Sequence, residues 1–226
     1  MLENIPKATR NLIIINVIMF IATLINKTFM VDTFALFYPS SPFFRPWQII
    51  THMFMHGGFA HIILNMYALF MFGSVIERTI GEKKFLILYF VCGLGAVALH
   101  LGVQYIQAQS FIKGIAEGSE TAMANYAALK SIRTLGASGA IYGLLIAYAM
   151  LFPDARLSII FLPFTSMSSK TWVIIFAVLE LITGITGTLD GLAHFAHLGG
   201  MLFGWLLIKY WKKKGTLFND YKGYGY

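Results

Sequence analysis

The sequence contains few charged residues and almost no cysteine. Only 12% of its 226 residues are charged, whereas soluble domains average about 25%. This is too little charge to cover a water-facing surface, which excludes an ordinary soluble enzyme. The single cysteine, Cys92, lies inside an apolar run, so an internal disulfide and a CxxC metal site are excluded as well.

Apolar residues take the place of the missing charge. They make up 58% of the chain, and the mean hydropathy is +0.70, which also excludes a disordered chain. Since a transmembrane helix needs about 20 apolar residues, the chain has room for several. The apolar runs predict six such helices, at about residues 11–30, 56–76, 85–107, 136–152, 171–185 and 193–210. The predicted fold class is an all-α polytopic membrane protein, with residues 1–226 forming one domain.

Two of the connections have a distinctive composition. Residues 34–50, FALFYPSSPFFRPWQII, are too apolar for a solvated loop and too rich in proline for a helix. We expect this segment to lie at the membrane interface, with Trp47 at headgroup level. Residues 109–133 are polar and are expected to form a loop, in which a short alanine-rich helix is an option.

The distribution of basic residues predicts an orientation. Six spans place both termini on the same side of the membrane, and twelve of the 17 Lys and Arg residues then fall on that side. The positive-inside rule therefore predicts cytoplasmic termini. The net charge of +7 is attributed to loops that face anionic lipid rather than to nucleic-acid binding.

A few polar residues lie at membrane depth, where each needs a partner or a water-filled cavity. His61 and Asn65 are four residues apart in the second run and so share a helix face. Ser138 begins the fourth run, and His197 lies near the start of the sixth. Because the second, fourth and sixth spans all begin on the outer side, these residues are predicted to lie at comparable depth.

A hydroxyl and an imidazole at one depth can act as a nucleophile and its general base. A serine at a helix start also has a free backbone N–H that can stabilise an oxyanion, and His61 and Asn65 can supply further donors. Plainer interpretations stay open on spacing alone. Ser138 would then be a small residue at a helix crossing, and His197 would make a structural hydrogen bond.

The glycines favour the chemical interpretation. Gly139 and Gly143 form one small-residue face, and Gly200 and Gly204 form another. Such faces let two helix backbones approach closely, as a hydrogen bond between Ser138 and His197 requires.

Together, these residues resemble the motifs of rhomboid intramembrane serine proteases. The family's GxSG motif corresponds to residues 136–139, its AHxxG motif to residues 196–200, and its HxxxN element to residues 61–65. Tyr142 matches a tyrosine that packs against the catalytic imidazole, and Gly73, Glu77 and Gly81 match a structural GxxxExxxG pattern. The resemblance covers about residues 47–205 and implies a rhomboid-like bundle.

The resemblance implies an activity and its residues. Ser138 would be the nucleophile and His197 the general base, while His61, Asn65 and the Ser138 N–H would bind the oxyanion. Gly136, Gly139 and Tyr142 would support them. The enzyme would hydrolyse a peptide bond in or near the transmembrane segment of a membrane-protein substrate, without metal or cofactor.

The resemblance also implies a setting for this activity. The protein would lie among membrane lipids, in the inner membrane of a bacterium, with its active site open to the outer side. Substrates would enter laterally near the fifth span. The alternative is a catalytically silent relative that binds membrane clients, although such relatives lack the serine or the histidine.

The remaining polar residues receive structural predictions. His194 is expected to be structural, although its spacing of three residues from His197 would also allow a metal pair. His52 and His56 are expected to hydrogen-bond the first outer loop. Glu180 is expected to be a partnered carboxylate near the inner half of the fifth span. Asp190 could orient His197, but it is assigned no role because the family uses a Ser–His dyad.

One position departs from the family pattern. Trp47 is followed by Gln48, where family members often have an arginine that packs the loop. This difference leaves the rigidity of the first outer loop in doubt.

Overall fold

The computed structural model describes residues 4–159, 162–187 and 192–218. Its main helices are α1 (Lys7–Ile25), α2 (Lys27–Phe34), α3 (Gln48–Thr51), α4 (Phe59–Ala68), α5 (Ser74–Ile80), α6 (Glu82–Ala116), α7 (Glu120–Ser131), α8 (Ser138–Leu151), α9 (Ser169–Thr186) and α10 (Leu192–Lys213). A 3₁₀ turn, η2 (His52–Phe54), follows α3, and a π-helical turn, η3 (Leu69–Gly73), joins α4 to α5. Two short strands, β1 (Arg156–Ile159) and β2 (Leu162–Ser168), pair antiparallel.

The helices confirm a helical polytopic membrane protein. Among the described residues, four helical segments are long and apolar enough to cross a membrane: α1, the continuous stretch Phe59–Ile80, α6 and α9. Helix α8 is apolar but has only 14 residues. The number of six spans therefore stays a prediction. Large apolar side chains such as Ile18 and Ile25 are exposed on the outside of α1, as contact with lipid requires.

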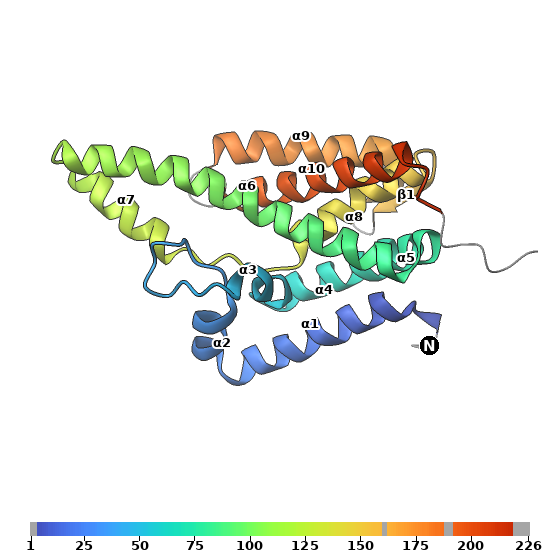
Figure 1. Cartoon of the computed structure of the whole chain (residues 1–226), viewed down its shortest axis with the longest axis horizontal. Helices are drawn as coiled ribbons and strands as arrows, with labels where there is room; N and C mark the ends of the chain where they lie inside the picture. Colours follow the sequence, from blue (N-terminus) through green and yellow to red (C-terminus); the bar gives the residue numbers. More distant parts are fainter. Residues whose placement is uncertain (1–3, 160–161, 188–191, 219–226) are drawn as a thin grey trace, which may run out of the picture.

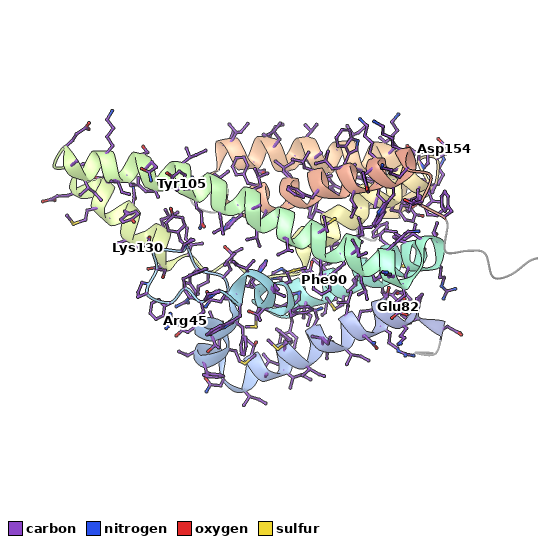
Figure 2. All side chains as sticks on the ribbon, viewed as in Figure 1. Arg45, Glu82, Phe90, Tyr105, Lys130 and Asp154 are labelled. Atoms are coloured by element: carbon purple, nitrogen blue, oxygen red, sulfur yellow. The ribbon has the colours of Figure 1, made fainter. Side chains whose placement is uncertain are left out.

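Helix α6 crosses the centre of the bundle (Figure 1). It packs against α8 and α10, and in this view α1 and α4 lie on one side of it and α9 and α10 on the other; α4 and α5 also contact α8. Its last turns project beyond the bundle beside α7, where Figure 2 labels Tyr105 and Lys130. The polar stretch 109–133 is thus mostly helical rather than a loop, because Ala108 and Leu129 are buried between the two helices.

The segment after α8 contains regular secondary structure. β1 and β2 pair antiparallel as a two-stranded hairpin. The indole Nε1 of Trp172 on α9 donates to the carbonyl of Leu157, at 2.9 Å. This bond fixes the hairpin to the start of α9.

The buried carboxylate of Glu77 anchors α1. The first N–H groups of a helix have no partner within the helix. The N–H groups of Ala8 and Thr9 donate to the two carboxylate oxygens of Glu77 at 2.9 and 2.7 Å, and the Thr9 hydroxyl donates to one of them at 2.8 Å. Glu77 therefore caps α1 from α5, which accounts for its place in the GxxxExxxG pattern.

Gln48 organises the first loop from inside. Its side chain is fully buried. The amide oxygen accepts from the N–H of Arg45 at 3.0 Å, and the amide nitrogen donates to the carbonyl of Phe43 at 2.9 Å. The indole of the neighbouring Trp47 donates to the carbonyl of Thr33 at 2.9 Å. Glutamine at this position therefore ties the loop together through backbone groups.

Glycines bring α8 and α10 into backbone contact. A methyl group placed on Gly200 would lie 1.8 Å from the carbonyl oxygen of Gly139, and one on Gly204 would lie 2.7 Å from that of Gly143. Both contacts advance by four residues in the same direction, so the two helices run parallel. Parallel helices in this register place the first turn of α8 level with the first turns of α10.

Candidate active site

Ser138 and His197 meet across the interface between α8 and α10. Ser138 is the first residue of α8, and His197 lies five residues after the start of α10. The imidazole Nε2 of His197 is 2.9 Å from Oγ of Ser138. This is the contact of a serine hydroxyl with a base that can accept its proton.

Tyr142 holds the imidazole from one face. Its ring stacks on that of His197, with centroids 4.2 Å apart and planes 8° apart. Tyr142 lies one turn after Ser138 on α8, so the helix that carries the hydroxyl also orients the histidine.

The backbone before α8 is fixed to the first loop. The N–H of Gly136 donates to the carbonyl of His52 at 2.9 Å, and the N–H of Thr134 donates to that of Leu36 at 2.9 Å. Gly136 has a φ of 129°, an angle that residues other than glycine rarely adopt. A methyl group there would lie 2.8 Å from Nε2 of His61 and 3.7 Å from Oγ of Ser138. Glycine therefore leaves the space between these two residues open.

His61 and Ser138 border this space, and Asn65 lies one helical turn after His61, so three N–H donors are available. The amide Nδ2 of Asn65 is buried and has no partner among the described residues. Nδ1 of His61 accepts from the N–H of Gly57 at 3.5 Å, which leaves its Nε2 as the donor. The N–H of Ser138 begins a helix and has no intrahelical partner. This donor set matches an oxyanion hole.

One cavity reaches the pair, and a second lies nearby. A cavity of about 50 Å³ lies beside Ser138 and His197 and is also lined by His52, His100 and Thr134. Its lining is mostly apolar, but these five residues give it polar groups, and it is large enough for a few water molecules. A second cavity, of about 450 Å³, lies between α4, α8 and α9 and is mostly apolar. Asn65 and Tyr142 line it, so it extends to the candidate oxyanion hole.

Glu180 on α9 is the residue that sequence reasoning misplaced. Its buried carboxylate accepts the hydroxyl of Tyr142 and lies 2.6 Å from Nδ1 of His194. The same oxygen is 3.0 Å from Nδ1 of His197. The prediction of a partnered carboxylate is correct, but its placement near the inner half, away from the site, is wrong. A lone acid in an apolar run is itself a signal of function, and it could have identified Glu180.

Glu180, His194 and His197 also form a group that could hold a metal ion. One ligand atom from each lies within 4.8 Å of the others, and no other such group occurs among the residues that the structure describes. The contacts of 2.6 and 3.0 Å are at the distances of hydrogen bonds and ion pairs, so the carboxylate already has partners without an ion.

Of the other two histidines that the sequence singles out, His52 has a hydrogen-bond partner and His56 has none among the described residues. Nδ1 of His52 contacts the carbonyl of Gln48 at 2.9 Å, and burial lowers the pKa of His52 to about 4. His52 thus supports the loop, as predicted. Both ring nitrogens of His56 lack a hydrogen-bond partner among the described residues, so the predicted bond to the loop is not found. His56 instead packs edge-on against His61. Asp190 lies outside the described residues.

The known proteins to which this chain is similar all carry rhomboid names. The chain is 30% identical over 162 residues to RHOMBOID-like protein 4 of Arabidopsis thaliana, covering 71% of this chain and 33% of that protein. It is 32% identical over 172 residues to the presenilin-associated rhomboid-like protein of Bos taurus mitochondria, covering 73% and 39%. It is 25% identical over 166 residues to YdcA of Bacillus subtilis (strain 168), named as a candidate rhomboid protease, covering 72% and 68%.

The chain thus spans well under half the length of the plant and mitochondrial relatives. The rhomboid domain model matches residues 44–214, a range that contains Ser138, His197 and every donor of the candidate oxyanion hole. The chain therefore belongs to the rhomboid family.

Proposed function

We propose that the protein is an intramembrane serine protease that uses Ser138 and His197 as a catalytic dyad. The observation that carries the proposal is the contact of 2.9 Å between Oγ of Ser138 and Nε2 of His197. Residues 1–226 would act as one rhomboid-like domain with its core at about residues 47–205.

The geometry supports an acyl-transfer sequence. Oγ of Ser138 attacks the carbonyl carbon of the substrate peptide bond while Nε2 of His197 takes the hydroxyl proton. The oxyanion accepts hydrogen bonds from Ser138 N–H, His61 and Asn65. His197 then gives its proton to the leaving amine, and a water molecule hydrolyses the acyl-enzyme by the same steps.

The two cavities suit the two reactants. The small cavity beside the dyad, with the polar groups of Thr134 and His100 in its lining, can hold the hydrolytic water. The larger apolar cavity between α4 and α9 can take an unwound part of a substrate's transmembrane segment, whose side chains are apolar. Substrates would then enter laterally between these two helices.

The proposed setting follows from the charge distribution. The protein would span the inner membrane of a bacterium with both termini in the cytoplasm. The starts of α4, α8 and α10 would face the outer side, so the dyad would open there.

The proposal is tested by labelling detergent-solubilised protein with a fluorophosphonate that reacts with activated serines. Wild type is compared with Ser138→Ala and His197→Ala. Ser74→Ala is the matched control, because Ser74 is a half-buried serine on α5 whose buried Oγ has no hydrogen-bond partner among the described residues. We expect wild type and Ser74→Ala to label and both dyad variants to lose the label.

The opposite result has a definite meaning. If folded wild-type protein stays unlabelled, or if Ser138→Ala labels like wild type, the protease proposal fails. The apolar cavity would still accommodate a transmembrane segment, and binding of membrane clients without hydrolysis would become the preferred function.

A further inference from the structure

Three polar side chains from two helices converge on the carboxylate of Glu180. The Tyr142 hydroxyl of α8 donates to Oε1. Nδ1 of His194 on α10 contacts Oε2 at 2.6 Å, and Nδ1 of His197 lies 3.0 Å from the same oxygen. The side chain of Glu180 is only 10% exposed. One carboxylate on α9 is therefore joined to both helices that carry the candidate dyad.

The position of Glu180 relative to the imidazole of His197 is chemically specific. Nε2 of this ring faces Ser138, and Nδ1 faces Glu180. A carboxylate accepts hydrogen bonds but cannot donate one. Its charge therefore favours the tautomer with the proton on Nδ1, which leaves Nε2 free to accept the proton of Ser138.

Satisfying the carboxylate does not require His197. The Tyr142 hydroxyl and His194 already provide one donor to each oxygen. The contact with His197 meets the distance of an ion pair without the alignment of a hydrogen bond, and Nδ1 of His197 has no hydrogen-bond partner among the described residues. Catalytic hydrogen bonds are often poorly aligned before substrate binds and tighten afterwards.

We propose that Glu180 is a positioning residue that holds His197 in the reactive tautomer and stabilises the imidazolium formed when Ser138 gives up its proton. This inference rests on the proposed protease function and extends the dyad to Ser138–His197–Glu180. When Oγ bonds to the substrate carbonyl, the Ser138 proton moves to Nε2 and the ring becomes positive. Glu180 stays ionised throughout, and the proton leaves with the amine product.

The low polarity around the site makes this charge important. Forming an imidazolium at membrane depth costs much free energy unless an opposite charge lies nearby. Among the described acidic residues, Glu180 is the one whose carboxylate forms an ion pair with His197. Tyr142 and His194 fix that carboxylate, so these two residues act on the base through Glu180 as well as through packing.

The test compares Glu180→Gln and Glu180→Asp with wild type by the rate of fluorophosphonate labelling per folded molecule. Glu180→Gln keeps the shape but removes the charge. Removing the charge of the aspartate in a Ser-His-Asp triad lowers kcat by about 10⁴, so we expect at least about a tenfold loss here. Glu180→Asp keeps the charge one methylene further away, and we expect an intermediate rate.

Glu77→Gln is the matched control. Glu77 is also a buried carboxylate with three hydrogen-bond donors, but all three come from the start of α1 and none from His197 or Tyr142. Its loss should lower stability and leave the labelling rate per folded molecule unchanged. On a transmembrane reporter substrate, Glu180→Gln should lower kcat with little change in KM, which a purely structural role would not produce.

The outcomes separate the two proposals. If wild type labels, Ser138→Ala does not, and both Glu180 variants label at the wild-type rate, the inference fails while the protease function stands. An unlabelled wild type ends both. If EDTA abolishes wild-type activity and Zn²⁺ alone restores it, Glu180 and its histidines bind a metal, and the positioning role is overturned.

Discussion

Nε2 of His197 lies 2.9 Å from Oγ of Ser138, although 59 residues separate the two in the chain. The contact depends on how closely α8 and α10 approach, and glycines at their interface set that distance. Gly200 in particular lies against the carbonyl of Gly139. The precision of the candidate site is therefore a property of helix packing.

Gly200→Ala should separate the dyad. Its methyl group would lie 1.8 Å from backbone that cannot move independently, and overpacking of this kind costs about 1–3 kcal/mol. We expect a lower Tm and at least about a tenfold slower labelling. Gly102→Ala on α6 is the control, because a methyl group there contacts nothing within 4 Å. Equal labelling of the two variants would show that the approach of α8 and α10 does not govern the site.

Asn65→Ala should reduce turnover without preventing folding. The unpartnered Nδ2 of Asn65 is available for an oxyanion, and loss of one such donor costs about 10²–10³ in kcat. The measurement is kcat on a transmembrane reporter substrate. Ile63→Ala is the control, since Ile63 is 61% exposed on the same helix. A kcat for Asn65→Ala close to that of Ile63→Ala would remove Asn65 from the oxyanion hole.

Gly136→Ala should block the space that a substrate carbonyl would enter. The methyl group would press on His61 at 2.8 Å and would require a φ of 129°. We expect labelling to fall by about tenfold or more. The control is Gly58→Ala, because Gly58 precedes α4 in extended backbone and a methyl group there meets nothing within 4 Å. A rate equal to that control would mean that the space above Gly136 is not used.

Gln48→Ala should loosen the first loop. The substitution leaves the N–H of Arg45 and the carbonyl of Phe43 without their partner, and losing each of these partly buried hydrogen bonds costs about 0.5–1.5 kcal/mol. The midpoint of thermal unfolding in detergent should fall, whereas Ile50→Ala, at a residue 49% exposed, should change it little. An unchanged midpoint would show that the loop is held by other contacts.

Acid should destabilise the protein through His52. This residue lies in the loop before α4, and burial lowers its pKa to about 4 from the ordinary 6.5. Below pH 6.5 the unfolded state binds a proton that the folded state does not. The stability is therefore complete above pH 6.5 and decreases as the pH falls toward 4, by about 3 kcal/mol.

The measurement is Tm between pH 7 and 4.5 for wild type and His52→Gln. The variant lacks the titrating group, so its Tm should depend less steeply on pH. Parallel curves for the two proteins would show that His52 does not control the acid response.

The sequence predicted the membrane class and the polar positions well. Apolar runs of about 20 residues leave few alternatives to helices in a membrane, and the glycine pairs of α8 and α10 were visible as four-residue spacings. The sequence-based prediction was less accurate for the segments that connect the apolar runs. Helix α6 extends to Ala116 and β1–β2 form a hairpin, because packing against α7 and α9 overrides a weak local preference.

Sequence alone determined that Ser138 begins a helix and that His61 and Asn65 share a helix face, because these follow from local spacing along one helix. Tertiary structure decided which of the polar side chains meet. Periodicity gives the approximate depth of a residue and its face, but not the rotation of one helix against another. That rotation turns Glu180 of α9 toward Nδ1 of His197 while Ser138 of α8 occupies the Nε2 side. Only the packing of three helices around one imidazole could reveal this arrangement.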